Sequence, residues 1–199
     1  MPAPLLWING PFGVGKTQTA HELLRRLPGS VVSDPEHLGY GLHRMLPRAQ
    51  RGDFQDWPLW RRGVREVLSG VAHAHSGPVI VPMTVTDPAY FEEIVGTLRR
   101  EGHDVRHFAL LADRRTLVRR IRSRGPRRDN WALGKLDHCL TTLARPEFAA
   151  HVRTEQRTVP QVAEAVAASA GLRLAPNADG PARHWVRRAV VNVRHLRIG

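Results

Sequence analysis

The chain has 199 residues, 42% of them hydrophobic, and a formal net charge of +12 at pH 7. This length supplies one sizeable core, and no glycine, proline or serine tract interrupts it as a linker would. No run approaches the ~18 apolar residues of a membrane span, and the single cysteine, Cys139, excludes an internal disulfide. We therefore expect a cytoplasmic protein.

The positive charge comes almost entirely from arginine, since only Lys16 and Lys135 among 30 basic residues are lysines. Such a bias is typical of proteins that bind nucleic acid or an anionic membrane. Eight arginines fall within Arg114–Arg128, where no aromatic residue is interleaved as in a nucleic-acid groove, and five fall within Arg183–Arg197. We expect no nucleic-acid partner, because phosphate handling explains the first cluster better.

The first predicted elements are a buried strand over Leu5–Asn9 and a helix over Gln18–Leu27. The sequence between them fits the phosphate-loop pattern of Gly, four residues, Gly, Lys, and Ser or Thr. Its glycines let backbone N–H groups surround a phosphate, while Lys16 reaches the β/γ-phosphates of ATP and Thr17 ligates Mg²⁺. An accidental glycine-rich turn is the alternative. The predicted nucleotide-binding residues are Gly10, Pro11, Phe12, Gly13, Val14, Gly15, Lys16, Thr17 and Gln18.

A second short strand is predicted over Ser30–Ser33, and it is followed by two carboxylates, Asp34 and Glu36. In a parallel sheet this end of the strand lies close to the phosphate loop. We predict that Asp34 is a general base or a Mg²⁺ ligand, and that both carboxylates contact the substrate. Alternatively, Asp34 only caps the following helix.

Two tryptophans three residues apart, Trp57 and Trp60, precede a helical pattern that runs through Val64 to Val71. Their indoles could stack on a planar substrate or serve as core anchors. We include both, with Arg61, in the predicted substrate site.

The next predicted strands are Val79–Met83 and Val105–Leu111, with a helix from about Ala89 to Arg100 between them. The helix after Asp113 is rich in arginine, and the arginines continue into a loop at residues 125–128. Although such a run is usually a solvated face, arginines near a phosphate site can clamp phosphoryl oxygens. We predict that Arg120 and Arg124 stabilise transition-state charge.

The remaining elements are a helix over Leu133–Leu143, a fifth strand over Phe148–Val152, and a helix from Val159 to about Ala170 with Thr158 as its cap. Five β-α alternations predict an α/β fold whose parallel sheet is covered on both faces. Residues 184–198 form a basic amphipathic pattern that could pack on the protein, form a strand, or contact a membrane surface.

From Leu5 to about Ala170 the chain resembles the small P-loop kinases of the shikimate-kinase, nucleoside-monophosphate-kinase and chloramphenicol-phosphotransferase type. The matching features are the phosphate loop, the acid after the second strand, and a lid-like helix over Leu117–Arg124. The segments Ile8–Thr17, Asp34–Glu36 and Val81–Thr84 look closer still to the ATP-binding tunicamycin-resistance proteins, which are associated with membranes.

This resemblance implies a three-layer P-loop NTPase domain over residues 1–171 with a five-stranded parallel sheet and a helical lid, followed by a basic segment over 172–199. Many P-loop proteins end the third strand with an Asp that holds Mg²⁺, but this chain has Pro82-Met83-Thr84 there. Asp34, alone or with Glu36, would have to replace it.

The resemblance also implies an ATP- and Mg²⁺-dependent phosphotransferase that acts on a hydroxyl of a small molecule, with tunicamycin or a related nucleoside antibiotic as the suspected substrate. One alternative is an ATP-binding protein that sequesters the drug. Another is an ATPase stimulated by nucleic acid.

Overall fold

A computed structural model describes residues 3–123 and 129–177. Five parallel strands form one sheet in the order β2-β3-β1-β4-β5. The strands are β1 (Leu5–Asn9), β2 (Val31–Val32), β3 (Val79–Pro82), β4 (Val105–Leu111) and β5 (His151–Arg153). The five-stranded parallel sheet predicted from the sequence is confirmed.

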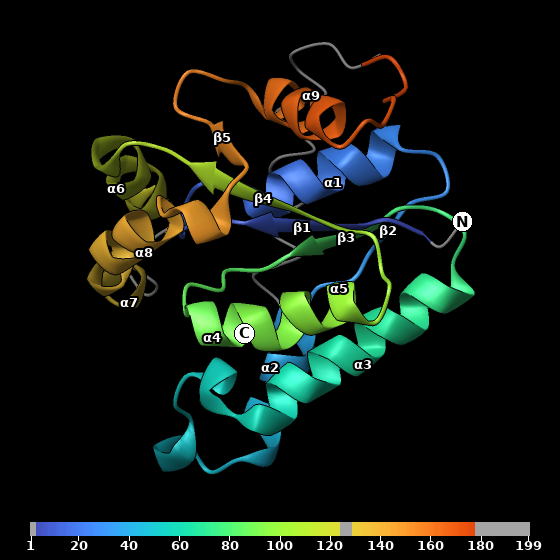
Figure 1. The fold of residues 1–199 in the computed structure, drawn as a ribbon. Helices are drawn as coiled ribbons and strands as arrows, with labels where there is room; N and C mark the ends of the chain where they lie inside the picture. The colour runs from blue at the N-terminus through green and yellow to red at the C-terminus, as the bar shows by residue number, and fades with distance from the viewer. Residues whose placement is uncertain (1–2, 124–128, 178–199) are drawn as a thin grey trace.

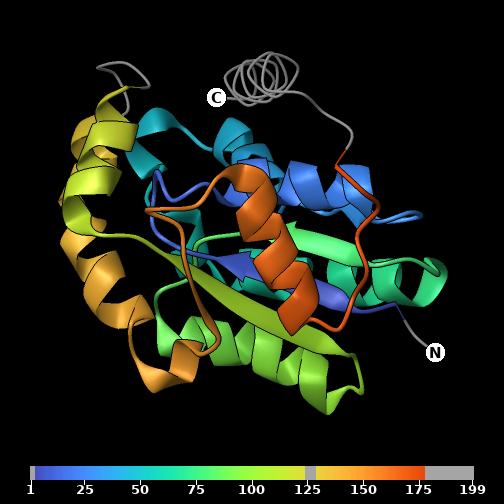
Figure 2. The same cartoon turned by 90° about the horizontal axis from the view of Figure 1, so that it is seen from above.

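Helices cover both faces of the sheet, so that the domain has three layers (Figure 1). The helices α1 (Lys16–Arg26) and α9 (Val159–Ser169) lie on one face, and Figure 2 shows α9 above the sheet beside α1. The other face carries α2 (Glu36–Met45), α3 (Pro58–Ala74) and a helical run of α4 (Pro88–Phe91), the π-helical turn η3 (Glu92–Gly96) and α5 (Thr97–Arg100).

The remaining helices stand at the end of the sheet to which the strands point (Figure 1). They are α6 (Arg114–Arg122), α7 (Asp129–Gly134) and α8 (Leu136–Leu143). Short 3₁₀ turns complete the description: η1 (Arg48–Gln50), η2 (Phe54–Asp56) and η5 (Pro146–Phe148).

The strand β1 is buried along its whole length, as expected for a parallel strand covered on both sides. Leu5 and Trp7 join the core under α3, whereas Leu6 and Ile8 join the core under α1 and α9. Each buried side chain of this size stabilises the fold by about 1.5–3 kcal/mol. A hydrophobic core therefore lies on each face of the sheet, and β1 contributes side chains to both cores.

The largest differences between predicted and observed boundaries occur at three elements. The first helix begins at Lys16, because Gly15 takes a left-handed conformation as its N-cap. The fifth strand begins at His151, which pairs with Ala109 of β4, while the buried ring of Phe148 belongs to the turn before it. The helix predicted over Leu133–Leu143 is divided at Lys135 into α7 and α8.

Residues 172–177 run back along α1. Arg26 and Ala175 exchange two hydrogen bonds of 2.8 Å, and Leu172 and Leu174 pack against the core between α1 and α9. The predicted amphipathic segment at 184–198 lies outside the described residues. Among the helices of residues 3–123 and 129–177, none combines the length and apolar character needed to cross a membrane.

Candidate active site

The phosphate loop connects the end of β1 to the start of α1. Gly10, Gly13 and Gly15 have φ angles of 147°, 80° and 107°, in the left-handed region that favours glycine. A Cβ atom at Gly10 would lie 2.7 Å from the carbonyl oxygen of Leu110, and one at Gly13 would lie 2.9 Å from a side-chain carbon of Ile121. The loop therefore requires glycine at positions 10 and 13 for both backbone conformation and space, and at position 15 for backbone conformation.

The buried side chain of Asn9 fixes the position at which the loop leaves the sheet. Asn9 Oδ1 accepts hydrogen bonds from the N–H groups of Gly10 (2.8 Å) and Val85 (3.1 Å), and Asn9 Nδ2 donates to the carbonyl of Val85 (2.8 Å). Thr84 Oγ1 donates to the carbonyl of Gly10 at 2.8 Å. Neither supporting role was predicted from the sequence, although an Asn at the end of a fully apolar strand was a signal.

Lys16 bends back over the loop. Its Nζ donates to the carbonyls of Gly10 (2.8 Å) and Pro11 (3.2 Å) and lies 5.4 Å from the centre of the Phe12 ring. The ammonium group is thus held at the mouth of the loop, where the phosphates of a nucleotide would lie.

Thr17 and Gln18 lie in the first turn of α1 and are half-buried. Among the described residues, no three His, Cys, Asp or Glu side chains are grouped to hold a metal ion. Mg²⁺ usually needs only one or two protein oxygens together with substrate phosphates and water. Thr17 and Asp34 carry oxygens of this kind. These two residues would supply the protein ligands of the ion beside the phosphates.

Asp34 follows β2 and is half-buried. Burial and the nearby charge of Glu36 raise its pKa from 3.8 to about 6, while a hydrogen bond from the N–H of Glu36 (3.0 Å) and the positive charges of His37 and Lys16 act in the opposite direction. Asp34 thus accepts one backbone hydrogen bond just before α2, whose N-cap residue is Pro35, and the charge of Lys16 is near enough to act on its pKa.

Glu36, the second predicted carboxylate, lies in the first turn of α2. Its Oε2 accepts a hydrogen bond from the hydroxyl of Tyr40 at 3.1 Å. This bond orients the carboxylate beside Asp34.

The two predicted tryptophans have different environments. Trp57 is 37% exposed at the start of α3, so its ring is accessible to a ligand. Trp60 has no exposed surface: its ring packs on Phe54, and its Nε1 donates to the carbonyl of Pro35 at 3.1 Å. Trp60 is thus a core anchor, and the stacking role predicted for it is wrong in this geometry because no ring surface is available.

Arg61 is buried and makes contacts within its own chain. Its Nε donates to Glu93 Oε2 and its Nη1 to the carbonyl of Gln55, both at 2.5 Å, while the guanidinium lies 4.1 Å from the centre of the Tyr90 ring. The predicted contact between Arg61 and substrate would require one of these partners to be displaced.

Arg120 projects from α6 to the phosphate loop. It donates to the carbonyl of Val14 (3.3 Å) and to the side chain and backbone oxygens of Thr154 (3.1 and 3.0 Å). The lid helix and the loop after β5 are therefore joined at the phosphate loop. Arg124, the other predicted lid arginine, lies outside the described residues.

Two contacts that the sequence did not indicate connect α7 and α8 to this site. The ring of Trp131 meets that of Phe12 edge-on, with centroids 4.8 Å apart, and Lys135 Nζ pairs with Asp53 Oδ2 at 2.5 Å. Burial raises the pKa of the nearby Cys139 thiol, while Lys16 and Lys135 act to lower it. The charges of both lysines therefore act on this thiol.

Comparison with known proteins agrees with this arrangement. Residues 5–147 match a family model described as an AAA domain. The structure of the tunicamycin resistance protein of Deinococcus radiodurans is 35% identical to this chain, with a TM-score of 0.75, over 88% of this chain and 100% of that one. The chain belongs to the tunicamycin-resistance family of P-loop proteins.

More distant structures share the fold of this family member. A sugar kinase from Janibacter sp. HTCC2649 is 19% identical with a TM-score of 0.63, over 86% of this chain and 96% of that one. A gluconokinase from Sinorhizobium meliloti 1021 is 17% identical with a TM-score of 0.59, over 85% and 93%. No curated protein sequence matches the chain. The family resemblance and the fold class predicted from the sequence are confirmed.

Proposed function

We propose that the protein transfers the γ-phosphoryl group of Mg²⁺·ATP to a hydroxyl group of a small molecule. The observation that carries the proposal is the phosphate loop, in which left-handed glycines and the Lys16 ammonium have the arrangement that holds nucleotide phosphates. Asp34, whose pKa is raised to about 6, can accept a proton at neutral pH, and in this proposal it receives the proton of the acceptor hydroxyl.

The residues have distinct roles in this proposal. Backbone N–H groups of Phe12, Gly13 and Gly15 with Lys16 would hold the phosphates, and Thr17 with Asp34 would hold Mg²⁺, which would neutralise developing charge. Asp34 receives the hydroxyl proton or organises the metal. Arg120, already at the loop, and Arg124 stabilise the equatorial oxygens of the transferring group.

For the acceptor, we infer tunicamycin or a related nucleoside antibiotic, with resistance as the result. The support is the 35% identity to the tunicamycin resistance protein over its whole length. The exposed ring of Trp57 is available to stack on a base, and Asp34 and Glu36 offer carboxylates to sugar hydroxyls. We retain membrane contact through residues 184–198 as a prediction, because the acyl tail of such a drug would place it at a membrane.

The test is to express the wild type, Lys16→Ala and Asp34→Asn in a sensitive bacterium, measure tunicamycin tolerance, and look for the mass gain of one phosphate on the drug. Tolerance and a phosphorylated drug with the wild type alone are expected. Tolerance that survives Asp34→Asn, without any mass gain, would indicate sequestration instead. ATP hydrolysis that requires oligonucleotide and falls with salt would indicate the nucleic-acid-stimulated ATPase.

A further inference from the structure

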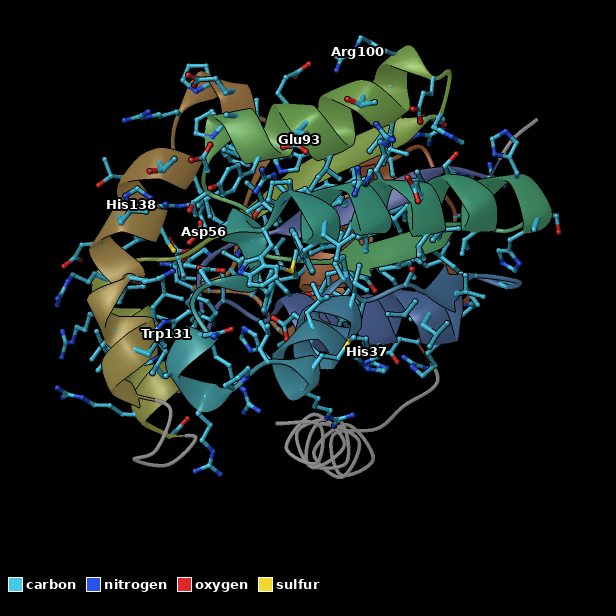
Figure 3. All side chains as sticks on the ribbon, turned by 90° about the horizontal axis from the view of Figure 1, so that it is seen from below. His37, Asp56, Glu93, Arg100, Trp131 and His138 are labelled. Atoms are coloured by element: carbon cyan, nitrogen blue, oxygen red, sulfur yellow. The ribbon has the colours of Figure 1, made fainter. Side chains whose placement is uncertain are left out.

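The turn η2 and the residues around it carry several paired charges. We use the term η2 wall for residues 53–56 with the first turns of α3 and α4. Lys135, which pairs with Asp53, lies 5.0 Å from the centre of the Trp131 ring, and that ring meets Phe12 of the phosphate loop. Asp53 pairs with Lys135, the carbonyl of Gln55 accepts from Arg61, and Asp56 accepts from the hydroxyl of Tyr90 at 3.1 Å. Figure 3 shows Asp56 between the helix that carries Glu93 and the helices that carry Trp131 and His138.

The arginine of this wall is already occupied by an internal carboxylate. Arginine binds carboxylates and phosphates through its planar edge, and a buried arginine at an acceptor site would select anionic substrates. In this protein Glu93 lies on that edge, at 2.5 Å from Arg61 Nε. The Arg61 side chain is 10% exposed and that of Glu93 is 43% exposed, so Glu93 covers Arg61 on the solvent side.

The neighbouring charges are also unfavourable for an anion. Among the described residues, Arg61 pairs with Glu93 and Lys135 pairs with Asp53. Asp56 adds a carboxylate to this wall, and Asp34 and Glu36 follow β2 beside the phosphate loop. An anionic acceptor would have to displace Glu93, which is tethered to the same fold, and would then face several carboxylates.

We propose that the acceptor site takes an uncharged hydroxylated compound and that Glu93, by occupying Arg61, excludes acceptors that carry a carboxylate or phosphate. This inference rests on the proposed function, since it describes the acceptor of that same transfer. This acceptor preference differs from that of a kinase for a sugar acid. Gluconate should bind poorly, whereas a neutral sugar or nucleoside should bind.

The test uses Glu93→Gln, which keeps the shape and one hydrogen-bond acceptor but removes the negative charge. Binding to protein saturated with Mg²⁺ and a non-hydrolysable ATP analogue is measured by calorimetry for two pairs of probes, glucose with gluconate and uridine with uridine 5′-monophosphate. A charge-assisted hydrogen bond to the released Arg61 should tighten binding of at least one anion about 10- to 100-fold. Binding of the neutral probes should be unchanged.

Glu92→Gln is the matched control. Glu92 is the preceding residue and pairs with Arg100, which Figure 3 shows at the other end of the helical run. This variant loses the same charge and should not gain anion binding. In Glu93→Gln/Arg61→Gln the gain should disappear, and thermal melting of each variant checks folding.

Anion binding by the wild type that equals that of Glu93→Gln would overturn the proposal. So would a folded Glu93→Gln variant that binds anions no better than the wild type or Glu92→Gln. These readouts need no turnover and are repeated without nucleotide. Failure to bind the ATP analogue or to phosphorylate any acceptor would count against the proposed function, separately from this result.

Discussion

At the scale of single residues, Asp34 determines how the site should respond to pH. Burial and the charge of Glu36 raise its pKa to about 6, and a general base acts only when it is deprotonated. With the acceptor identified, kcat/KM of the wild type should rise with pH through a midpoint near 6 and then level off. Asp34→Asn should lower kcat/KM by about 10²–10⁴-fold and remove this rise. An unchanged pH profile in the variant would exclude Asp34 as the base.

The same shift has a consequence for stability. Because the folded-state pKa of Asp34 exceeds its ordinary value of 3.8, the folded protein binds more protons than the unfolded chain between about pH 4 and 6. Asp34 therefore makes the free energy of unfolding fall as pH rises through this window. Above it, Asp34→Asn should be more stable than the wild type by roughly 1–2 kcal/mol, with a smaller difference at pH 4.5. Urea unfolding at pH 4.5 and 7.5 measures this, and a larger difference at the lower pH would contradict it.

Asn9 has a structural role that activity alone would not reveal. Asn9→Leu keeps the branching and number of side-chain heavy atoms but leaves three buried backbone groups of Gly10 and Val85 without their hydrogen bonds. Each such group costs about 1–3 kcal/mol, so the variant should lose roughly 3–9 kcal/mol of unfolding free energy. Thr84→Val removes one bond to the same loop and should cost about 1–2 kcal/mol. Chemical denaturation should rank the two in this order, and the reverse order would show that Asn9 does not hold the loop.

At the scale of elements, glycines at different positions should respond oppositely to alanine. A Cβ atom at Gly10 would meet the backbone of β4, where nothing can move without shifting the sheet, so Gly10→Ala should destabilise the protein and distort the phosphate loop. Gly70 lies on the exposed side of α3, where a Cβ atom would have no neighbour within 4 Å, and Gly70→Ala should stabilise the protein by about 0.5–1 kcal/mol. Thermal melting distinguishes the two, and a stable, nucleotide-binding Gly10→Ala variant would contradict the steric account.

The elements that the sequence predicted well are those defined by local chemistry. The phosphate-loop pattern predicts left-handed glycines and a helix start within eight residues, and Thr158 caps α9 as expected, with Gln161 completing the capping box. Asp113 likewise caps α6 through the N–H of Thr116. In each case the partners are close in sequence, so the pattern contains the whole interaction.

The features that the sequence did not predict depend on partners far along the chain. The helix breaks at Lys135, whose ammonium pairs with Asp53, 82 residues away. Trp60 is a core anchor because its partners, Pro35 and Phe54, come from other elements. Arg61 was predicted to contact substrate, but its Nε donates to Glu93, which lies 32 residues further along the chain. No local pattern contains such tertiary pairs.

At the scale of the whole molecule, charge is divided between the two halves of the candidate site. The chain has a net charge of +12, and its arginine-rich helix α6 contacts the phosphate loop through Arg120. Other elements of the site carry four carboxylates, those of Asp34, Glu36, Asp53 and Asp56. In the proposed function, positive charge would accompany the triphosphate and these carboxylates would face the acceptor.

Nucleotide binding should be visible in the stability of the whole protein. A ligand that binds only the folded state at about 100 times its Kd stabilises it by about 2.7 kcal/mol, which shifts Tm by roughly 5–10 °C in a protein of this size. Mg²⁺ with a non-hydrolysable ATP analogue should produce such a shift in the wild type. In Lys16→Ala most of it should be lost, because the cation that meets the phosphates is gone.

Arg65→Ala supplies the control, since it also removes one positive charge but from α3, where Arg65 lies near Glu66 and Glu101. Its melting temperature should rise with the nucleotide as much as that of the wild type. Chelation of Mg²⁺ should reduce the shift in both proteins, because the triphosphate then lacks its counter-ion. If Lys16→Ala were stabilised by the nucleotide as strongly as the wild type and Arg65→Ala, the phosphate loop would not be the nucleotide site, and the roles assigned to Thr17, Asp34 and Arg120 would fall with it.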